Sequence, residues 1–387
     1  MRFEVVIIGA GIAGISTAYS LQKRGVTNVL VIDKGGVNAG STTWAAGIVS
    51  HLFRRKLELG IIGNSIKVFK EIEKESTGHF SYHQLGMLSV GRKRQEQRLL
   101  QALETMRQMD VAANLLDRQS ITELVPEIIG DDLKLGIHCM ESGYLDQALF
   151  TGVTADLLES RGVSIIEGVE VHGIIIGRDR EVKGIDTSQG PIASEKVVIA
   201  GGVWSKSIGE RAGLSLPISM QKAQSMTLLL QKSMHIPVFF DLTSEIYMRP
   251  VTDTVILVGN GSKPYRGKID NYSPRAESRF MNGLKLRLSS RFKHFNDSKI
   301  LDAWSGLYSS TPDGLPLVGE SNRARGLFYL CAFQGLGIMF APGSAGLVSD
   351  VIVGKSSREI LPFRAERFRG GLDRTTTYHK HWSQELR

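Results

Sequence analysis

Three glycines near the start of the chain have the spacing of a dinucleotide-binding turn. Gly9, Gly11 and Gly14 form G-x-G-x-x-G directly after a short apolar run and at the start of an apolar helical pattern. In that setting the first glycine permits a tight turn, the second lets a diphosphate approach the backbone, and the third lets helix and strand pack closely. The N–H groups and partial positive charge of the helix start favour the diphosphate. The pattern predicts an adenine dinucleotide site.

An acidic residue follows at the distance that such a site needs. Asp33 ends the apolar stretch NVLVID, about twenty residues after the last glycine. Its carboxylate can accept hydrogen bonds from an adenosine ribose, and it disfavours a 2′-phosphate. This pattern does not separate FAD from NAD.

The run GSTTWAAG at residues 40–47 combines hydroxyl groups with small residues. The hydroxyls of Ser41, Thr42 and Thr43 can cap a helix start or meet phosphate and ribityl oxygens; for Thr43 the two interpretations are equally supported. The small residues 45–47 let the backbone lie against a flat ring. We expect a glycine-rich turn that opens a new apolar helix here.

These groups need a strand–turn–helix scaffold, and the sequence predicts one. Residues 5–8 indicate a buried parallel strand, residues 12–24 a helix, and the stretch that ends at Asp33 a second strand. The chain has 387 residues, of which 42% are hydrophobic and 22% are charged. This is the composition of a globular protein, and the length favours two domains.

Several classes of protein are disfavoured. The only two cysteines, Cys139 and Cys331, are far apart and lack metal-ligand spacing, which favours reduced thiols in a cytoplasmic protein without a metal. Glycines interrupt the N-terminal apolar run, so it does not resemble a signal peptide. Pro342 and Asp350 interrupt the longest later apolar stretch, so we expect no membrane span. The net charge is +8, but no nucleic-acid motif accompanies it, and we expect no nucleic-acid partner.

Five separated segments then point to a family. They are GSTTWAAG with the helix expected at 57–78, SYHQLGMLSVG (81–91), VVIAGGVWSKSIG (197–209), AWSGLYSSTPDGLPLVG (303–319) and CAFQGLGIMFAPGSAGLVSD (331–350). In this order, and with the opening glycines, they resemble the D-amino-acid oxidase superfamily of FAD enzymes, over residues 3–354. Within it, the chain looks most like the flavin domains of dimethylglycine and sarcosine dehydrogenases and the flavin subunits of dye-linked proline dehydrogenases.

The resemblance implies an α/β fold (α+β overall). A Rossmann-like FAD-binding domain would be joined to a second, mostly antiparallel β-sheet substrate domain. The FAD-binding domain would be discontinuous, at residues 1–80, 143–214 and 312–360, with the substrate domain at 81–142 and 215–311 and a basic C-terminal tail at 361–387. In the substrate domain we expect strands in 218–231, 245–250 and 254–261 and a helix in 275–292.

The resemblance also implies which residues contact FAD. The backbone at 169 and 171 would flank the adenine, the turn at 200–202 would cover the diphosphate, and a helix starting near Pro342 would point its N-terminus at the flavin N1–C2=O edge. The expected FAD contacts are Gly9, Gly11, Ile12, Ala13, Gly14, Asp33, Lys34, Ser41, Thr42, Thr43, Ala45, Ala46, Gly47, Val169, Val171, Ala200, Gly201, Trp204, Gly306, Tyr308, Gly335, Leu336, Gly337, Ile338 and Met339.

Relatives oxidise the C–N bond of small amino acids or amines by transferring hydride to flavin N5, so a proline-, sarcosine- or dimethylglycine-type substrate is implied. A substrate carboxylate needs a fixed cation, and the planar fork of arginine suits it. Arg249 and Tyr247 lie two residues apart in a predicted strand and therefore share a face. We expect Arg249 to bind the carboxylate, with Tyr308 in the pocket. His51 could contact the ring or be a buried structural histidine.

The chain also departs from its relatives. Dimethylglycine and sarcosine dehydrogenases carry, at the position of Trp44, the histidine that forms their covalent flavin bond; an indole cannot form it, so we expect non-covalent FAD. The lysine and the flavin-tethering cysteine of monomeric sarcosine oxidases are replaced by Met339 and Gly306, and their oxygen-activating lysine falls in the apolar stretch TVILVGNG. These differences favour a dehydrogenase that passes electrons to a carrier or partner subunit.

Two alternatives remain at this point. The chain could be a non-catalytic flavin-binding subunit or assembly factor, with its basic tail, including YHKHWSQELR, as a docking element. An NAD-dependent dehydrogenase is disfavoured, because the chain continues into GSTTWAAG rather than into a further strand–helix unit.

Overall fold

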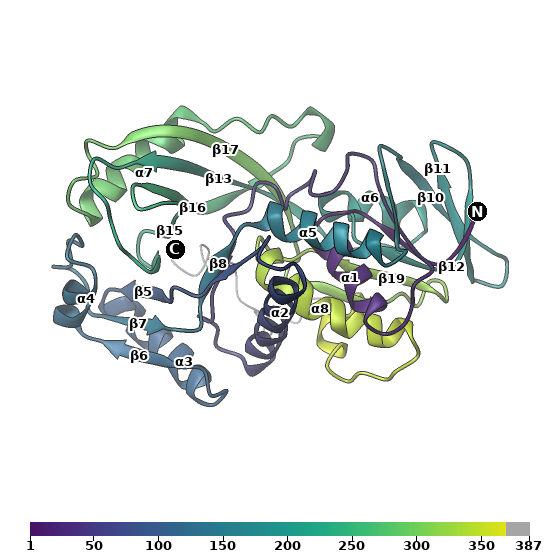
Figure 1. Ribbon diagram of the computed structural model, residues 1–387, viewed down its shortest axis with the longest axis horizontal. Coiled ribbons are helices and arrows are strands. Elements are labelled where there is room, and N and C mark those ends of the chain that lie inside the picture. Colours follow the sequence, from purple (N-terminus) through teal and green to yellow (C-terminus); the bar gives the residue numbers. More distant parts are fainter. Residues whose placement is uncertain (369–387) are drawn as a thin grey trace.

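The computed structural model describes residues 1–368. The docking element expected in YHKHWSQELR lies outside these residues. In Figure 1 two sheets occupy the two ends of an elongated molecule, with helix α2 (Lys56–Glu75) between them. Within residues 1–368, no helix is both long and apolar enough to cross a membrane.

Sheet A carries the nucleotide-binding fingerprint. Its strands, in spatial order, are β10 (Val171–Ile176), β11 (Val182–Thr187), β12 (Ile192–Ile199), β1 (Arg2–Ile8), β2 (Val29–Asp33) and β9 (Ser164–Glu167), with β19 (Leu327–Cys331) on β12 and β18 (Leu317–Glu320) on β19. Strands β9, β2, β1, β12 and β19 are mutually parallel. The buried apolar runs in β1 (residues 5–8), β2 (29–32), β12 (197–199) and β19 (327–331) suit a sheet that is covered on both faces.

Sheet C forms the other end. Its strands, in spatial order, are β17 (Lys299–Ser310), β13 (Ser219–Leu229), β16 (Val255–Tyr265), β15 (Ile246–Pro250), β14 (Val238–Asp241), β5 (Met87–Gly91), β7 (Leu135–Cys139) and β6 (Ala113–Leu116). All neighbouring pairs are antiparallel except β14 with β5. A small sheet B joins β3 (Ile48–Val49), β8 (Gly143–Leu145) and β4 (Tyr82–His83).

Helices cover both large sheets. They are α1 (Ile12–Gln22), α2, α3 (Glu96–Arg107), α4 (Arg118–Leu124), α5 (Gln147–Ser160), α6 (Ser205–Arg211), α7 (Ser278–Arg291) and α8 (Gly337–Ile352). The predicted mixed α/β fold, with a parallel nucleotide-binding sheet and a mainly antiparallel second sheet, is confirmed, as are the expected strands at β13, β15 and β16 and the helix α7.

Two helix starts differ from expectation. No helix begins in residues 41–47, which form turns; the chain continues into β3, and α2 begins at Lys56. Helix α8 begins at Gly337 rather than near Pro342, which lies inside it. Proline removes one helical N–H, and the next one, on Gly343, donates instead to Ser65 Oγ of α2 at 2.9 Å. A side chain at Gly343 would place Cβ 2.2 Å from the Ile61 carbonyl oxygen. The contact of Gly343 with α2 therefore gives the N–H next to the proline a partner, and it fixes α8 closely against α2.

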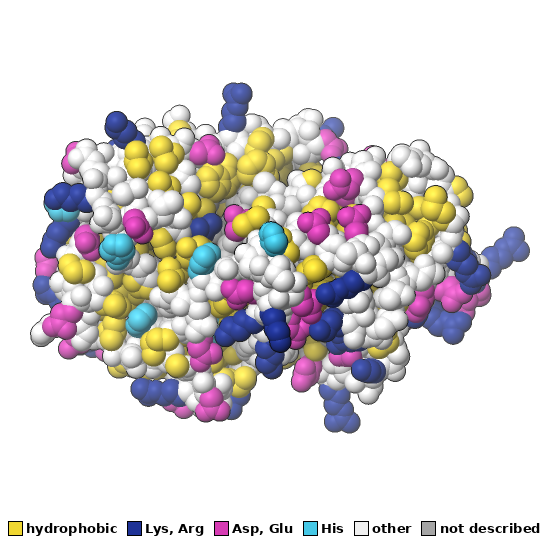
Figure 2. All heavy atoms as spheres, viewed as in Figure 1, with side chains coloured by type: hydrophobic (Ala, Val, Ile, Leu, Met, Phe, Trp, Pro, Cys, Tyr) yellow, Lys and Arg dark blue, Asp and Glu magenta, His cyan; other side chains and the backbone are white. Residues whose placement is uncertain are grey.

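The charged side chains form no continuous basic surface on the face shown in Figure 2. Lys and Arg side chains lie interspersed with Asp and Glu both at its edge and near its centre, and hydrophobic side chains are scattered between them. A nucleic-acid-binding face would instead cluster its basic side chains.

Candidate functional site

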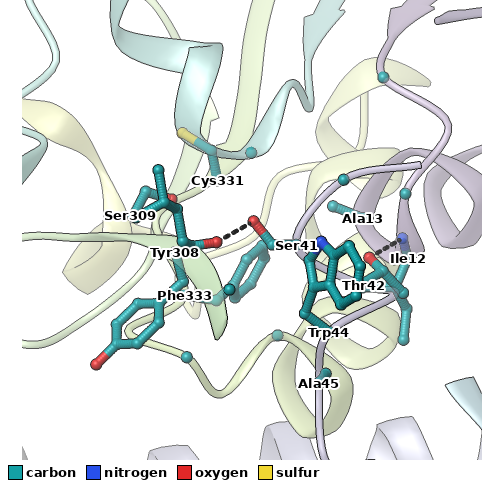
Figure 3. A pocket seen from close by; sticks show the side chains of 18 of the residues that line it. Ile12, Ala13, Ser41, Thr42, Trp44, Ala45, Tyr308, Ser309, Cys331 and Phe333 are labelled. Atoms are coloured by element: carbon teal, nitrogen blue, oxygen red, sulfur yellow. Dashed lines mark hydrogen bonds between the residues drawn. The ribbon is translucent and has the colours of Figure 1, made fainter. Parts of the chain in front are cut away.

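One cavity runs from the nucleotide-binding turn of sheet A to the inner face of sheet C. It encloses about 810 Å³. Its walls come from the ends of β1 and β2, the turn at residues 39–47, the segment 330–339 and strands β13 to β17. Figure 3 shows Trp44 and Thr42 on one wall, with Tyr308, Phe333 and Cys331 opposite.

The glycine turn is shaped by contacts that exclude side chains. A Cβ at Gly9, where φ is +113°, would lie 2.5 Å from the Ala200 carbonyl oxygen, and one at Gly14 would lie 1.8 Å from the Gly9 carbonyl oxygen. Gly9 therefore brings β1 against the end of β12, and Gly14 brings α1 against the turn. Gly11 caps α1 without a side chain, and Thr42 Oγ1 accepts the N–H of Ile12 at 3.1 Å.

Asp33 stabilises the turn beside it with both carboxylate oxygens. Oδ2 accepts the N–H of Ala10 at 2.8 Å, and Oδ1 accepts those of Gly35 at 2.7 Å and Gly36 at 3.1 Å. The carboxylate lies on the cavity wall, where Oδ2, which accepts one N–H, keeps acceptor capacity for a ribose hydroxyl.

An aromatic and cationic cluster lines the same end of the cavity. Lys34 Nζ lies 4.3 Å from the centre of the Trp204 ring, a cation–π contact. Arg211 donates to the carbonyl oxygen of His172 at 3.1 Å and packs at the start of β10. Within residues 1–368, the buried Trp204 Nε1 has no hydrogen-bond partner, so this wall offers an unused donor.

The turn before α8 forms part of the opposite wall. Ala332 and Gln334 have φ of +60° and +59°, a conformation that non-glycine residues adopt rarely, and Gly335 has φ of +81°. Helix α8 then starts at the cavity, and the side chain of its N-cap, Leu336, makes no capping hydrogen bond. Its first N–H groups can therefore serve an acceptor in the cavity.

The three hydroxyl residues of the GSTTWAAG run point in different directions. Thr42 caps α1, and Ser41 Oγ donates to the carbonyl oxygen of Leu307 in β17 at 2.6 Å. Thr43 is exposed, and its hydroxyl donates to the Asn38 carbonyl oxygen. Trp44 lines the cavity, and its carbonyl oxygen accepts Trp304 Nε1 at 3.1 Å.

Two tyrosines form the sheet C wall. Tyr247 Oη lies 3.0 Å from Ser225 Oγ, and Tyr308 Oη donates to Ser262 Oγ at 2.6 Å. Burial raises the pKa of both phenols above the ordinary value. Both stay protonated at neutral pH, so the wall presents aromatic faces and neutral hydroxyls.

Arg249 and His51 do not line this cavity. Arg249 Nε donates to the Ala46 carbonyl oxygen at 2.5 Å and Nη1 to that of Pro250 at 3.0 Å, and the guanidinium lies 4.7 Å from the Tyr144 ring centre. His51 is 2% exposed, and its Nδ1 lies 2.9 Å from Ser142 Oγ. Burial lowers the pKa of His51 to about 4, so it is neutral at pH 7. Arg249 and Tyr247 lie two residues apart in β15, but only Tyr247 lines the cavity, and the Arg249 guanidinium supports the turn behind it.

The structure gathers most of the predicted site residues in one place. Those on the cavity wall are Gly9, Gly11, Ile12, Ala13, Asp33, Lys34, Ser41, Thr42, Ala45, Ala46, Gly47, Val169, Val171, Ala200, Gly201, Trp204, Tyr247, Gly306, Tyr308, Gly335, Leu336, Gly337, Ile338 and Met339. Gly14, Thr43, Arg249 and His51 lie outside it.

Sequence reasoning missed several wall residues on the sheet C side, among them Met87, Phe240, Glu245, Ser262 and Lys268. Phe240 pairs with Tyr247 across β14 and β15, and Phe240 also pairs with Ser89 of β5, close to Met87. Strand alternation around Tyr247 could have found Phe240 only if the pairing of β14 had been known. Lys268 lies in a short segment after β16 that carries no motif.

The residues present fit a flavin dinucleotide. At both ends of the cavity, glycines leave the backbone without side chains. A Cβ at Gly306 would lie 2.7 Å from Trp44 Cβ, and one at Gly11 would lie 3.1 Å from Thr42 Oγ1. Trp204 Nε1 and the α8 N-terminus supply donors. The cavity is long enough to connect a nucleotide turn with an aromatic pocket.

Comparison with known proteins agrees with this fit. The family model described as FAD dependent oxidoreductase (DAO) matches residues 4–351. The chain is 26% identical to mitochondrial sarcosine dehydrogenase of Homo sapiens over 99% of its own length, but spans only 43% of that protein. It is 26% identical to sarcosine oxidase subunit beta of an Arthrobacter species, covering 95% of this chain and 92% of that protein. The mitochondrial pyruvate dehydrogenase phosphatase regulatory subunit of Mus musculus is 23% identical over 99% of this chain and 45% of that protein.

Solved structures have the same fold. L-proline dehydrogenase from P. horikoshii superposes with a TM-score of 0.88 at 25% identity, over 96% of this chain and 98% of that one. Glycine oxidase from Geobacillus kaustophilus gives a TM-score of 0.83 at 24% identity, over 95% and 99%. With its family match over most of its length, this chain belongs to the FAD dependent oxidoreductase family, and its relatives include a sarcosine oxidase subunit and a glycine oxidase.

Proposed function

We propose that this chain oxidises the C–N bond of a small amino acid or a secondary or tertiary amine, of the proline, sarcosine or dimethylglycine type. The single cavity that joins the nucleotide turn to the tyrosine wall of sheet C carries this proposal. A small amine bound against Tyr247 and Tyr308 would lie beside the expected flavin ring. The names of the sarcosine and proline relatives support the same substrate class.

The protein's own part in this reaction is binding and orientation. FAD, when bound, supplies the hydride acceptor. Tyr247 and Tyr308 exclude water from the pocket, and their neutral hydroxyls can orient a substrate amine or carboxylate. Both rings are held in place, because Gly259 leaves room for Tyr247, and Gly335 packs on Tyr308 with a built Cβ 3.2 Å from Cζ.

A substrate carboxylate needs a cation that reaches the cavity. Of the cations on the described cavity wall, Lys34 and Arg211 lie at the nucleotide end, and Lys268 lies on the sheet C side. Arg249 was the residue favoured by sequence, but two of its guanidinium nitrogens are engaged by backbone carbonyls. We therefore prefer Lys268 as the carboxylate partner and assign Arg249 to the support of Ala46.

The segment that carries Lys268 is anchored at both ends. Tyr265 Oη donates to the Lys268 carbonyl oxygen at 3.1 Å, and Tyr272 Oη donates to Ser305 Oγ at 2.7 Å, directly before Gly306 of the cavity wall. The two tyrosine rings meet edge to face at 5.6 Å. This arrangement holds the exposed Lys268 at the cavity mouth, where a substrate carboxylate would enter.

The division of labour follows the two large sheets. We propose that residues 1–80, 143–214 and 312–360 bind FAD and that residues 81–142 and 215–311 bind substrate.

Leu257, in the stretch where relatives activate oxygen with a lysine, is buried. A carrier or partner subunit is therefore the proposed electron acceptor.

An anaerobic substrate screen tests the function. The purified protein should absorb near about 450 nm as flavoproteins do, and this band should bleach when the right amine is added without oxygen. Proline, sarcosine and dimethylglycine should be compared with their N-acyl derivatives, which lack a basic nitrogen. Absence of bleaching with every cyclic and N-alkyl amino acid in a broad panel would overturn the proposal.

A non-catalytic flavin-binding subunit or assembly factor is the second candidate. One relative that matches 99% of this chain is named as a regulatory subunit. This candidate predicts bound flavin without amine-dependent bleaching, and a partner protein that binds when residues 369–387 are present. A chain that bleaches with an amine and retains its partners after removal of these residues would exclude it.

A further inference from the structure

A buried chain of polar contacts links the last described segment to the turn that precedes α8. Arg367, in the 3-10 turn η5 (Ala365–Phe368), donates from Nε to Asp313 Oδ2 at 2.6 Å and from Nη2 to Oδ1 at 3.0 Å. Thr311 Oγ1 lies 2.9 Å from Asp313 Oδ1 and accepts Gln334 Nε2 at 2.8 Å. The chain therefore runs from Arg367 through Asp313 and Thr311 to Gln334 on the cavity wall.

Every member of this chain is shielded from water. The side chains of Arg367 and Asp313 are 13% and 4% exposed, and Thr311 and Gln334 are 7% and 4% exposed. A two-pronged arginine–carboxylate pair has fixed geometry. Because it is also buried, screening by salt weakens it little. The Arg367–Asp313 pair can thus fix the position of the groups bonded to it, in addition to balancing charge.

The end of the chain is a turn that needs outside support. Gln334 has φ of +59° and Ala332 has φ of +60°, conformations that are unfavourable for non-glycine residues and persist where the surroundings hold them. Gln334 is held by its N–H to the Ser309 carbonyl oxygen at 3.1 Å and by Nε2 to the Ala332 carbonyl oxygen at 3.0 Å and to Thr311. Of these contacts, only the one to Thr311 leads away from the cavity.

The same turn sets where α8 begins. Leu336 accepts the N–H groups of Met339 and Phe340 at 3.1 Å, and residues 331–339 all line the cavity. A shift of Gln334 would move the N–H groups at the helix start, which the fit of FAD to this cavity requires in place.

We propose that Arg367 is a positioning residue for FAD: through Asp313, Thr311 and Gln334 it holds the turn at residues 331–336 and the start of α8 in the geometry that binds the flavin. The inference rests on the position of FAD proposed above, but not on the substrate. It gives the segment after α8 a part in cofactor binding that neither the basic charge of the tail nor any motif indicates.

Arg367 also has a purely local role to be separated from this one. Its Nη1 donates to the carbonyl oxygens of Phe363 and Arg364, and Nη2 donates to that of Leu315. A local strut would lower the stability of the protein without a specific effect on FAD. The two roles are separated at Thr311, which lies between Asp313 and Gln334. Its Oγ1 also lies 2.7 Å from the Leu315 carbonyl oxygen, to which Arg367 Nη2 donates, so a loss of stability in Thr311→Val fits either role and only its FAD affinity distinguishes them.

The test measures FAD affinity and needs no substrate. Apoprotein is titrated with FAD by quenching of flavin fluorescence, and its melting temperature is measured in parallel, for Arg367→Gln, Thr311→Val, the double variant and Arg161→Gln. Arg161 is a matched control, because its Nη2 donates to Glu75 Oε2 at 2.8 Å in a partly buried pair far from the turn. The visible circular dichroism of bound flavin reports on its surroundings.

We expect Arg367→Gln and Thr311→Val each to raise the dissociation constant for FAD about tenfold, as loss of one charge-assisted or buried hydrogen bond does. The double variant should be little weaker than either single one, because both break the same chain. Arg161→Gln should keep the wild-type constant. Unchanged affinity in Thr311→Val, or additive losses in the double variant, would overturn the proposal. If Arg367→Gln does not fold, Thr311→Val alone decides, with an altered flavin dichroism as the second supporting signal.

Discussion

Gly306 of β17 and Trp44 of the GSTTWAAG run are in contact at the centre of the site. A Cβ built on Gly306 would lie 2.7 Å from Trp44 Cβ and 3.3 Å from its Cγ. Trp304 Nε1, two residues before Gly306, donates to the Trp44 carbonyl oxygen at 3.1 Å. This contact joins sheet C to the turn that follows the nucleotide-binding fingerprint, and it sets the width of the cavity between them.

Gly306→Ala should therefore disturb FAD binding. The new methyl group would push the Trp44 backbone, and its turn, away from β17. We expect at least a tenfold increase in the dissociation constant for FAD, of the order that a displaced binding group produces. Gly283→Ala in α7 is the control, because its added Cβ meets nothing within 4 Å; it should leave FAD affinity unchanged and stabilise the helix by up to about 1 kcal/mol. Equal FAD affinity in the two variants would contradict the assignment.

Thr42 should contribute to stability through α1. Thr42→Val keeps the shape of the side chain but removes the acceptor of the Ile12 N–H. The free energy of unfolding of the apoprotein should fall by about 1 kcal/mol, as for other lost N-terminal caps. Thr42→Ser keeps the hydroxyl and should restore most of it. Urea denaturation measures the stability of both variants. A valine variant as stable as the wild type would show that the Thr42 cap does not stabilise the protein.

FAD should be released by acid. Trp44 cannot form a bond to the flavin, and burial raises the pKa of the Cys331 thiol, the cysteine on the described cavity wall, to about 12. At pH 7 the thiol is therefore protonated, and it is the thiolate that acts as a nucleophile. Precipitation with trichloroacetic acid should leave the yellow colour in the supernatant. A yellow pellet would indicate a covalent bond and disprove this prediction.

Glu58 should make stability depend on pH. It is 8% exposed in the first turn of α2, and desolvation raises its pKa to about 7, against the opposing effect of Arg55 and Arg54. A raised folded-state pKa gives stability that is complete below the unfolded value near 4.5 and is lost as pH rises through 7. Glu58→Gln removes this loss. Its free energy of unfolding should exceed that of the wild type by up to about 3 kcal/mol at pH 8 and match it near pH 4.5.

The pH series needs two comparisons. Glu73→Gln, on the same helix, controls for the loss of a carboxylate from α2. His51 acts in the opposite sense, because its lowered pKa gives stability that is present above about 6.5 and is lost as pH falls through 4. That loss should persist in Glu58→Gln. Parallel curves for Glu58→Gln and the wild type between pH 5 and 8 would refute the role of Glu58.

Lys268 should determine affinity for substrates with a carboxylate. Lys268→Met keeps the length of the side chain but removes the charge, and should raise KM for an amino-acid substrate about tenfold with little change in kcat, because the lost interaction binds ground state and transition state alike. Amines without a carboxylate should be unaffected. Lys263→Met, an exposed lysine of β16 outside the cavity wall, is the control. A KM effect confined to Arg249→Lys would return the role to Arg249.

The sequence predicted the parts of the site that depend on local spacing. The glycine turn and Asp33 sit where their spacing requires, because one strand–turn–helix unit fixes them. Local spacing does not predict which partner each hydroxyl of residues 41–43 binds. Their directions depend on Leu307 of β17 and on α1, and a turn without a helix carries no periodic signal that would reveal such contacts.

Arg249 shows the same limit on a strand. Strand alternation predicts that Arg249 shares a face with Tyr247. It does not predict whether the guanidinium reaches the cavity or is buried behind its wall. The carbonyl oxygen of Ala46, some two hundred residues earlier in the chain, engages the guanidinium. The start of α8 at Gly337 was hidden for another reason: Pro342 is a usual helix boundary, and it is accommodated only because Ser65 of α2 accepts the neighbouring N–H.

The parallel pairing of β12 with β19 and the packing of α1 on α8 have a consequence for synthesis of the chain. The glycine turn before α1 and the segment before α8 close the same site, so this wall is missing until residues 331–339 have been synthesised. The same holds for sheet C, because β5 can pair with β14 only after β14, which comes much later in the chain, has been synthesised. Long-range pairings of this kind form late and slowly. The cavity that would hold FAD is therefore complete only after residues 331–339 have folded against β12 and α1.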